Sequence, residues 1–118
     1  IACVGQVAGI ECAALIDSLD RLPDLDAICT GQCMDVPTEI DLQYAVAAAL
    51  ASRARTFKNK PDAKVVWGHI LNYAQSFPQR EMGVMLVSDI HRGIGKDLFT
   101  VPQFANWANT VSELMFYE

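Results

Sequence analysis

The chain contains no apolar stretch long enough to cross a membrane. A bilayer-spanning helix needs about 18–20 consecutive apolar residues, and charged residues or prolines interrupt every apolar run here sooner than that. Basic residues are also few, nine Lys and Arg against 14 Asp and Glu, which gives a formal net charge of −5. Such a balance does not favour general attraction to nucleic-acid phosphates. We therefore expect no membrane partner and no sequence-independent nucleic-acid binding by the domain as a whole.

The spacing of the cysteines does not fit a zinc knuckle. The four cysteines occupy positions 3, 12, 29 and 33, and only Cys29 and Cys33 lie close together, in a Cys-x-x-x-Cys pattern. A tetrahedral zinc site usually takes closely spaced pairs of ligands from two separate knuckles, as in Cys-x-x-Cys repeats. A cysteine pair in a loop also lacks the helix N-terminus that lowers a thiol pKa. We expect reduced thiols in a cytoplasmic protein. A small zinc site made by Cys29, Cys33 and His69 or His91 stays open as an alternative.

The sequence also lacks a nucleotide-binding loop and a recognisable catalytic group. "GIGKD", residues Gly93–Asp97, has part of the phosphate-loop pattern. That pattern needs Gly where Ile90 stands, Ser or Thr where Asp97 stands, and a preceding strand. We interpret the segment as a helix stop, with His91 and Arg92 near the negative helix end. We expect no catalytic residue, no metal site and no cofactor in this part of the protein.

What the chain does contain is enough apolar sequence for one folded domain. It has 118 residues, of which 52% are hydrophobic and 19% are charged, so disorder and fibrous structure are excluded and a single domain over residues 1–118 is expected. The N-terminus has neither an initiator Met nor a basic leader. This start is typical of a trimmed chain or of a fragment of a longer protein.

Apolar residues recur at helical spacing in several segments. We predict a helix from Ala2 to Leu22 that ends at Pro23, and one helical turn over Asp24–Ile28 in the following loop. Four further helices are predicted to start at residues suited to helix N-termini: Thr38 (running to about Ala54), Pro61, Ser76 in a Ser-x-x-Gln capping box, and Thr100. Their predicted inward residues are Leu42, Val46, Ala49 and Leu50; Val66, Ile70, Ala74 and Phe77; Met82, Met85, Leu86 and Ile90; and Phe104, Trp107, Ala108, Val111 and Met115.

Short connections between helices of this length favour neighbours that run in opposite directions. "VMLV", residues Val84–Val87, is the one run that would also suit a buried strand, and the length of its segment favours a helix. No other segment alternates as a strand does. The sequence therefore predicts an all-α fold, a compact antiparallel bundle of about five main helices.

Charge is distributed unevenly along the chain. Arg21 is the only basic residue before Ala47, against eight acidic ones, and a short stretch then carries Arg53, Arg55, Lys58, Lys60 and Lys64. We predict that these five residues form an interaction surface for an acidic protein partner. The alternative is a nucleic-acid-binding helical module, which the basic cluster and the tight helix–turn–helix spacing near Phe77 would suit.

Four segments together resemble the C-terminal region of bacterial MoxR-like AAA+ ATPases: "LPDLDAI", "VPTEIDLQYAVAAALASRA", "ILNYAQSFPQREMGVMLVSDIHR" and "KDLFTVPQFANWA". The resemblance covers almost the whole chain. The matching positions are Leu22-Pro23-Asp24, Tyr44-Ala45, Pro78, Glu81-Met82, Leu86-Val87-x-Asp89 and Pro102-x-Phe104-x-x-Trp107-Ala108. The chain departs from the family pattern at "KNKPDAK", at "GIGK" and at its cysteines.

The resemblance implies a parent protein whose ATPase module, with ATP and Mg²⁺, lies N-terminal to Ile1. The present chain contains none of the nucleotide-binding motifs of such a module. It would then bind no ATP itself and would act in protein–protein contact, by packing on the motor, helping ring assembly or presenting a surface to a client in a chaperone-like remodelling machine.

Overall fold

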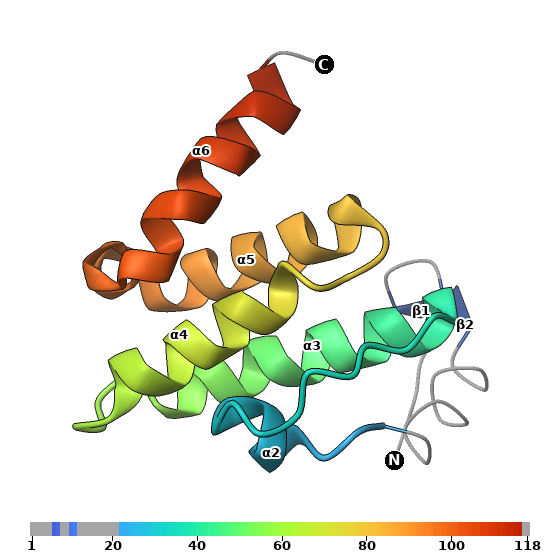
Figure 1. Cartoon of the computed structure of the whole chain (residues 1–118), viewed down its shortest axis with the longest axis horizontal. Coiled ribbons are helices and arrows are strands. Elements are labelled where there is room, and N and C mark those ends of the chain that lie inside the picture. The colour runs from blue at the N-terminus through green and yellow to red at the C-terminus, as the bar shows by residue number, and fades with distance from the viewer. Residues whose placement is uncertain (1–5, 8–9, 12–21, 117–118) are drawn as a thin grey trace.

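The chain forms a bundle of helices of unequal length. The computed structural model describes residues 6–7, 10–11 and 22–116, with side chains described over residues 22–109. Its helices are α2 (Leu25–Cys29), α3 (Ile40–Thr56), α4 (Ala63–Ala74), α5 (Arg80–Ile94), the 3-10 helix η1 (Gly95–Thr100) and α6 (Pro102–Phe116). Helices α3, α4 and α5 run in alternating directions, and α6 rises away from them (Figure 1). The predicted all-α bundle is confirmed.

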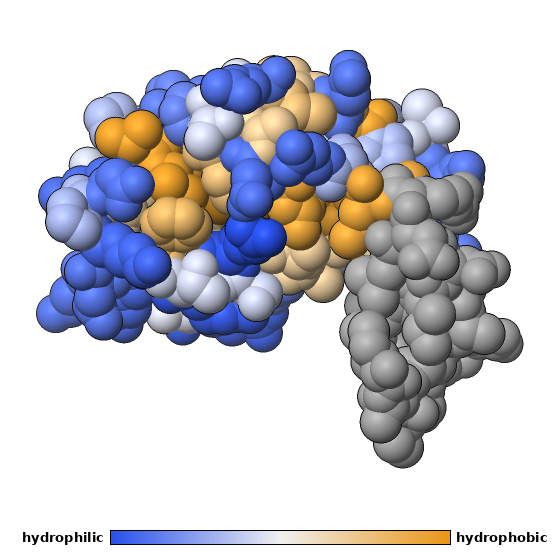
Figure 2. All heavy atoms as spheres, turned by 90° about the horizontal axis from the view of Figure 1, so that it is seen from below, coloured by the Kyte–Doolittle hydropathy of each residue, from blue (hydrophilic) through white to orange (hydrophobic). Residues whose placement is uncertain are grey.

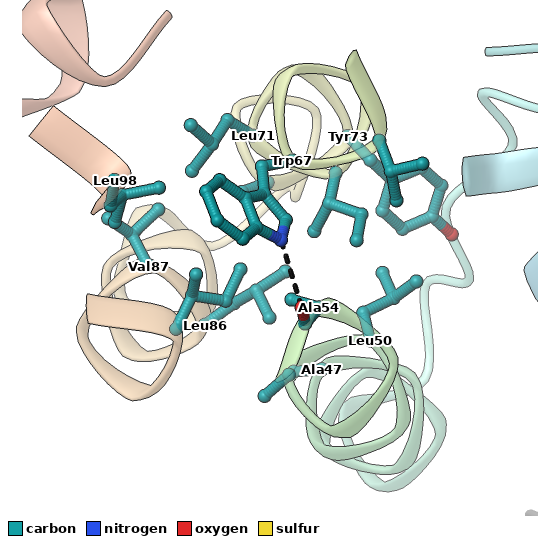
Figure 3. Packing of buried hydrophobic residues seen from close by; sticks show 14 of the residues in the cluster. Ala47, Leu50, Ala54, Trp67, Leu71, Tyr73, Leu86, Val87 and Leu98 are labelled. Carbon is teal, nitrogen blue, oxygen red and sulfur yellow. Dashed lines mark hydrogen bonds between the residues drawn. The ribbon is translucent and has the colours of Figure 1, made fainter. Parts of the chain in front are cut away.

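Helix α4 lies at the centre and contacts α2, α3, α5 and α6. Its Trp67, Ile70 and Leu71 side chains are at most 1% exposed. Figure 3 shows this part of the core, where side chains of α3, α5 and η1 surround Trp67. The predicted inward residues are buried at Leu42, Val46, Leu50, Val66, Ile70, Ala74, Phe77, Met82, Leu86, Ile90, Phe104 and Trp107, and half-buried at Ala49, Met85 and Ala108. The side chains of Val111 and Met115 lie outside the described ones.

The four helices begin two to four residues after the predicted starts. Helices α3, α4 and α5 follow Glu39, Asp62 and Gln79, none of which makes a side-chain cap hydrogen bond. Helix α6 begins at Pro102, in the first-turn position that suits proline. The capping box at Ser76 is wrong, because this hydroxyl donates to the carbonyl of Asn72 in the preceding helix, at 3.3 Å. The helix predicted to start at Pro61 begins two residues later, at Ala63.

The helix predicted over Ala2–Leu22 is wrong where the structure describes it. Residues Gln6–Val7 (β1) and Ile10–Glu11 (β2) pair as two antiparallel strands, with Gln6 opposite Glu11 and Val7 opposite Ile10. Gly5 and Gly9 flank these short strands in the sequence, and each costs a helix about 1 kcal/mol relative to Ala. Leu22, the last residue of that predicted helix, is not helical, and the other residues of the prediction lie outside the described ones.

The loop between Pro23 and Pro37 is a structural connector. Asp24 caps the predicted helical turn, α2, by accepting from the backbone N–H groups of Asp26 (3.0 Å) and Ala27 (3.3 Å). Gly31 then turns the chain at φ 77°, and a Cβ there would lie 2.6 Å from His69 Nδ1. The helical turn predicted over Asp24–Ile28 is thus present, one residue later, as α2.

Two buried polar side chains fix the end of this loop to the bundle. The Tyr73 hydroxyl donates to the Asp35 carbonyl at 2.6 Å, and Gln43 Nε2 donates to the Pro37 carbonyl at 2.9 Å. Burial raises the pKa of Tyr73, with smaller contributions from Cys33 and Asp35, so its hydroxyl remains a donor at neutral pH. The loop therefore enters α3 in a defined position.

Among the described residues, no helix is both long enough and apolar enough to traverse a lipid bilayer.

Candidate interaction surface

Three of the five basic residues singled out in the sequence lie around one hollow. Lys58, Lys60 and Lys64 line a depression of about 320 Å³ at the turn between α3 and α4. Trp67 forms part of its wall, and Asp97 and Thr100 of η1 reach the same hollow from a distant part of the sequence. Residues at this end of the molecule, on the left of Figures 1 and 2, are mostly hydrophilic. We call Lys58, Lys60 and Lys64 the lysine cluster.

Successive backbone turns bring the lysine cluster together. The N–H of Phe57 donates to the Ala54 carbonyl at 3.2 Å and the N–H of Lys60 donates to the Phe57 carbonyl at 3.0 Å. Trp67 Nε1 donates to the same Ala54 carbonyl at 2.9 Å. The Lys60 ammonium lies 5.6 Å from the centre of the Phe57 ring, a cation–π distance. The turn is thus held both by its own backbone and by the core tryptophan.

The lysine cluster carries positive charge that the described residues leave unbalanced. All three lysines are exposed, and none forms an ion pair within the described part of the chain. Asp97 is the only carboxylate among the described lining residues of the hollow. The C-terminal carbonyls of α3 give this end of the helix a partial negative charge, which favours the nearby ammonium groups. The arrangement suits binding of an acidic group from outside.

Arg53 and Arg55, the other two residues of the predicted surface, do not line this hollow. Arg53 forms an ion pair with Asp26 of α2. Arg55 Nη1 points to the Asp89 carbonyl of α5 at 3.5 Å, and its side chain packs against Gly93. Successive residues of a helix point about 100° apart, so neighbours in the sequence reach different partners. The structure therefore brings the three lysines, but not the two arginines, to this hollow.

Arg55 contributes to a second hollow, of about 370 Å³, between α3 and α5. It is also lined by Ala48, by Ala51 and by Arg92 and Asp89, which form an ion pair with each other. The Asp89 carboxylate already balances one of the two guanidinium groups, so this hollow is less cationic than the lysine cluster. A salt bridge this exposed contributes about 0–1 kcal/mol.

A third hollow, of about 270 Å³, was not identified from the sequence. There the His91 ring is stacked on Phe104, with ring centres 5.7 Å apart and planes 4° apart. The His91 and Phe99 rings form a T-shaped pair with their centres 5.0 Å apart. His91 Nε2 is buried without a hydrogen-bond partner in the described residues. Helix spacing could not indicate this cluster, because η1 brings Phe99 back over α5. His91 is thus an aromatic packing residue as well as a helix-end residue.

The cysteines of the zinc alternative are placed differently from one another. Cys29 is buried in the core at 4% exposure, and Cys33 is half-buried; both are free thiols. Within the described residues no three His, Cys, Asp or Glu side chains are grouped as metal ligands. Cys3 and Cys12 lie outside the described residues.

We expect iodoacetamide to alkylate Cys33 at least about tenfold faster than Cys29 in the folded protein. Burial raises the pKa of Cys29, an effect that Arg53 partly opposes, so its thiol stays protonated and shielded. Timed quenching followed by peptide mass spectrometry measures both rates in one sample. Protein unfolded in urea is the control, in which the two rates should converge. Equal rates in the folded protein would contradict the burial of Cys29.

Comparison of the chain with protein-family models, with curated proteins and with solved structures finds no match. Function is therefore inferred from the residues of the chain and their geometry.

Proposed function

We propose that this chain is a non-catalytic helical module that binds another protein through the lysine cluster. The observation that carries the proposal is the convergence of Lys58, Lys60 and Lys64 on one hollow without an ion-pair partner among the described residues. Complementary charges at an interface rim guide association and select partners. Each exposed pair contributes about 0.2–1 kcal/mol, so three pairs acting together have a measurable effect.

More specifically, we propose that the module belongs to a MoxR-like AAA+ ATPase of the cytoplasm. The resemblance in the four sequence segments supports this assignment, and a rigid helical bundle suits a lever or adaptor in a machine that moves its parts as rigid bodies. ATP and Mg²⁺ would bind the parent's motor, and the lysine cluster would contact the motor, a neighbouring subunit or a client. The coding sequence upstream of Ile1 tests the assignment, because it must contain a nucleotide-binding loop followed by an acidic magnesium-binding strand.

Reversing the three charges of the lysine cluster should weaken binding to that ATPase module. We expect the combined variant Lys58→Glu, Lys60→Glu and Lys64→Glu to raise the Kd at least about tenfold, which corresponds to about 1.4 kcal/mol. Biolayer interferometry between the two purified modules in about 0.1 M salt measures the change, and the difference should shrink in about 1 M salt because ions screen exposed charges.

The control variant changes net charge equally at a different place. Arg80, Arg92 and Lys96 are exposed and lie outside the lysine cluster, so their replacement by Glu should have a smaller effect. An equal effect of both variants would show that net charge alone matters and would remove the lysine cluster from the proposal. Retardation of DNA in a gel by the wild-type chain, lost in the lysine variant, would instead favour the nucleic-acid alternative.

A further inference from the structure

The end of the molecule opposite the lysine cluster is acidic. Asp35, Glu39 and Asp41 are exposed around the start of α3, and the sequence has no Lys or Arg between positions 22 and 52. We call these three residues the acidic end. The hydrogen bonds from Tyr73 and Gln43 to the carbonyls of Asp35 and Pro37 hold the loop before α3 in place. Figure 1 shows that the start and the finish of α3 lie on opposite sides of the molecule.

Helix α3 keeps the two charged surfaces apart. It has 17 residues, which span about 25 Å at 1.5 Å per residue. This separation exceeds two Debye lengths in about 0.1 M salt, where the Debye length is about 10 Å. Each surface therefore acts on a nearby partner largely independently of the other. The same screening weakens the general repulsion between two molecules that each carry a net charge of −5.

Exposed apolar side chains accompany both charged surfaces. Among the described residues, the large apolar side chains at the surface are Met34, Ile40, Val65 and Phe99. Met34 (46% exposed) and Ile40 (48%) adjoin the acidic end in the sequence, and Val65 (63%) follows Lys64 in the first turn of α4. Protein interfaces commonly combine an apolar centre with a polar rim. The two ends thus offer apolar surface as well as opposite charge.

From this complementarity we infer that the lysine cluster binds the acidic end of a second copy of the chain. The inference rests on the proposed function, because it names a partner for the same surface. In this contact the three ammonium groups of the lysine cluster meet the exposed Asp35 and Asp41 carboxylates, and Val65 is available to contact Met34 or Ile40 of the other copy. Since the two surfaces differ, the contact is heterologous, and repeated contacts build an open chain or close into a ring.

Sedimentation equilibrium of the wild-type chain provides the first test. Over about a hundredfold range of protein concentration in about 0.1 M salt, the average mass should rise above 12.9 kDa, and in about 1 M salt it should fall back towards that value. A mass of 12.9 kDa at every concentration in both salts would overturn the inference.

Mixing two charge-reversed variants provides the decisive test. One carries Lys58→Glu, Lys60→Glu and Lys64→Glu, and the other carries Asp35→Lys and Asp41→Lys. Each alone should associate at least about tenfold more weakly than wild type, and an equimolar mixture should recover association because opposite charges meet again. No recovery, or unchanged association of either variant alone, would overturn the inference.

Two further measurements separate the possible failures. Far-UV circular dichroism shows whether each variant is folded, and Asp35→Asn with Asp41→Asn replaces the reversed acidic variant if Lys disturbs the start of α3. This neutral pair should also weaken association. Binding to the ATPase module is measured separately. If the lysine variant loses that binding while the wild-type chain stays monomeric, the result contradicts self-association and supports the proposed function.

Discussion

Replacing Trp67 by Ala should lower the free energy of unfolding by about 3–5 kcal/mol, the range measured when large buried aromatic residues are truncated. The Trp67 side chain is 1% exposed and lies between the side chains of α3, α5 and η1 (Figure 3). The substitution leaves a cavity and removes the hydrogen bond from Nε1 to the Ala54 carbonyl. Small domains have only about 5–15 kcal/mol of stability, so this one change should remove a large part of it.

Urea unfolding followed by far-UV circular dichroism measures the effect without relying on tryptophan fluorescence. Trp67→Phe keeps most of the ring and removes the N–H donor, so its cost should be smaller, about 1–2 kcal/mol. Val65→Ala is the surface control, because Val65 is 63% exposed, and it should change stability by no more than about 0.5 kcal/mol. A cost for Trp67→Ala close to that of Val65→Ala would mean that the core is packed differently.

The helices that pack around Trp67 could be predicted because the packing itself leaves a periodic pattern in the sequence. Val66 and Ile70 on α4, and Leu86 and Ile90 on α5, face the interior at the spacing of one helical turn. Burial of such a stripe stabilises a helix more than residue propensity does. The N-terminal segment has a similar stripe, yet residues 6–7 and 10–11 pair as strands. A periodic pattern of apolar residues shows which face a helix would bury. It does not show whether another part of the chain provides a surface for that face to pack on.

Helix starts were harder to predict because a hydroxyl can bond in two directions. A capping Ser or Thr accepts from N–H groups ahead of it, whereas the hydroxyl of Thr100 donates to the Asp97 carbonyl behind it, at 2.9 Å. Ser76 likewise donates to the preceding helix. Both directions satisfy a backbone group, so the sequence motif does not decide between them.

The candidate site could be predicted only in part, because the sequence does not show which partner each side chain bonds to. Clustering of basic residues in the sequence identified Lys58, Lys60 and Lys64, which share a turn and a hollow. It also included Arg53 and Arg55, whose partners Asp26 and Asp89 come from distant segments. Charge counts along a sequence do not reveal which charges are already paired, and pairing decides which of them can bind a partner.

Replacing Gly83 by Ala should destabilise the protein by about 1–3 kcal/mol, although Gly→Ala inside a helix normally gains about 0.5–1 kcal/mol. A Cβ on Gly83 would lie 2.3 Å from the Ala74 carbonyl oxygen and 2.9 Å from Trp107 Cη2. The first neighbour is backbone. The second belongs to a ring that is 4% exposed and is fixed by its own hydrogen bond to the Leu71 carbonyl. Helix α5 must therefore move away from α4 and α6.

Gly93→Ala on the same helix is the matched control for Gly83→Ala. A Cβ there would lie 2.3 Å from Arg55 Cδ, but Arg55 is an exposed, flexible side chain that can swing into solvent. The gain in helix propensity should then dominate, and stability should stay within about 0.5 kcal/mol of wild type or rise. Urea unfolding of both variants measures the difference. Gly83→Ala as stable as Gly93→Ala would show that α5 does not approach α4 and α6 as closely as the structure has it.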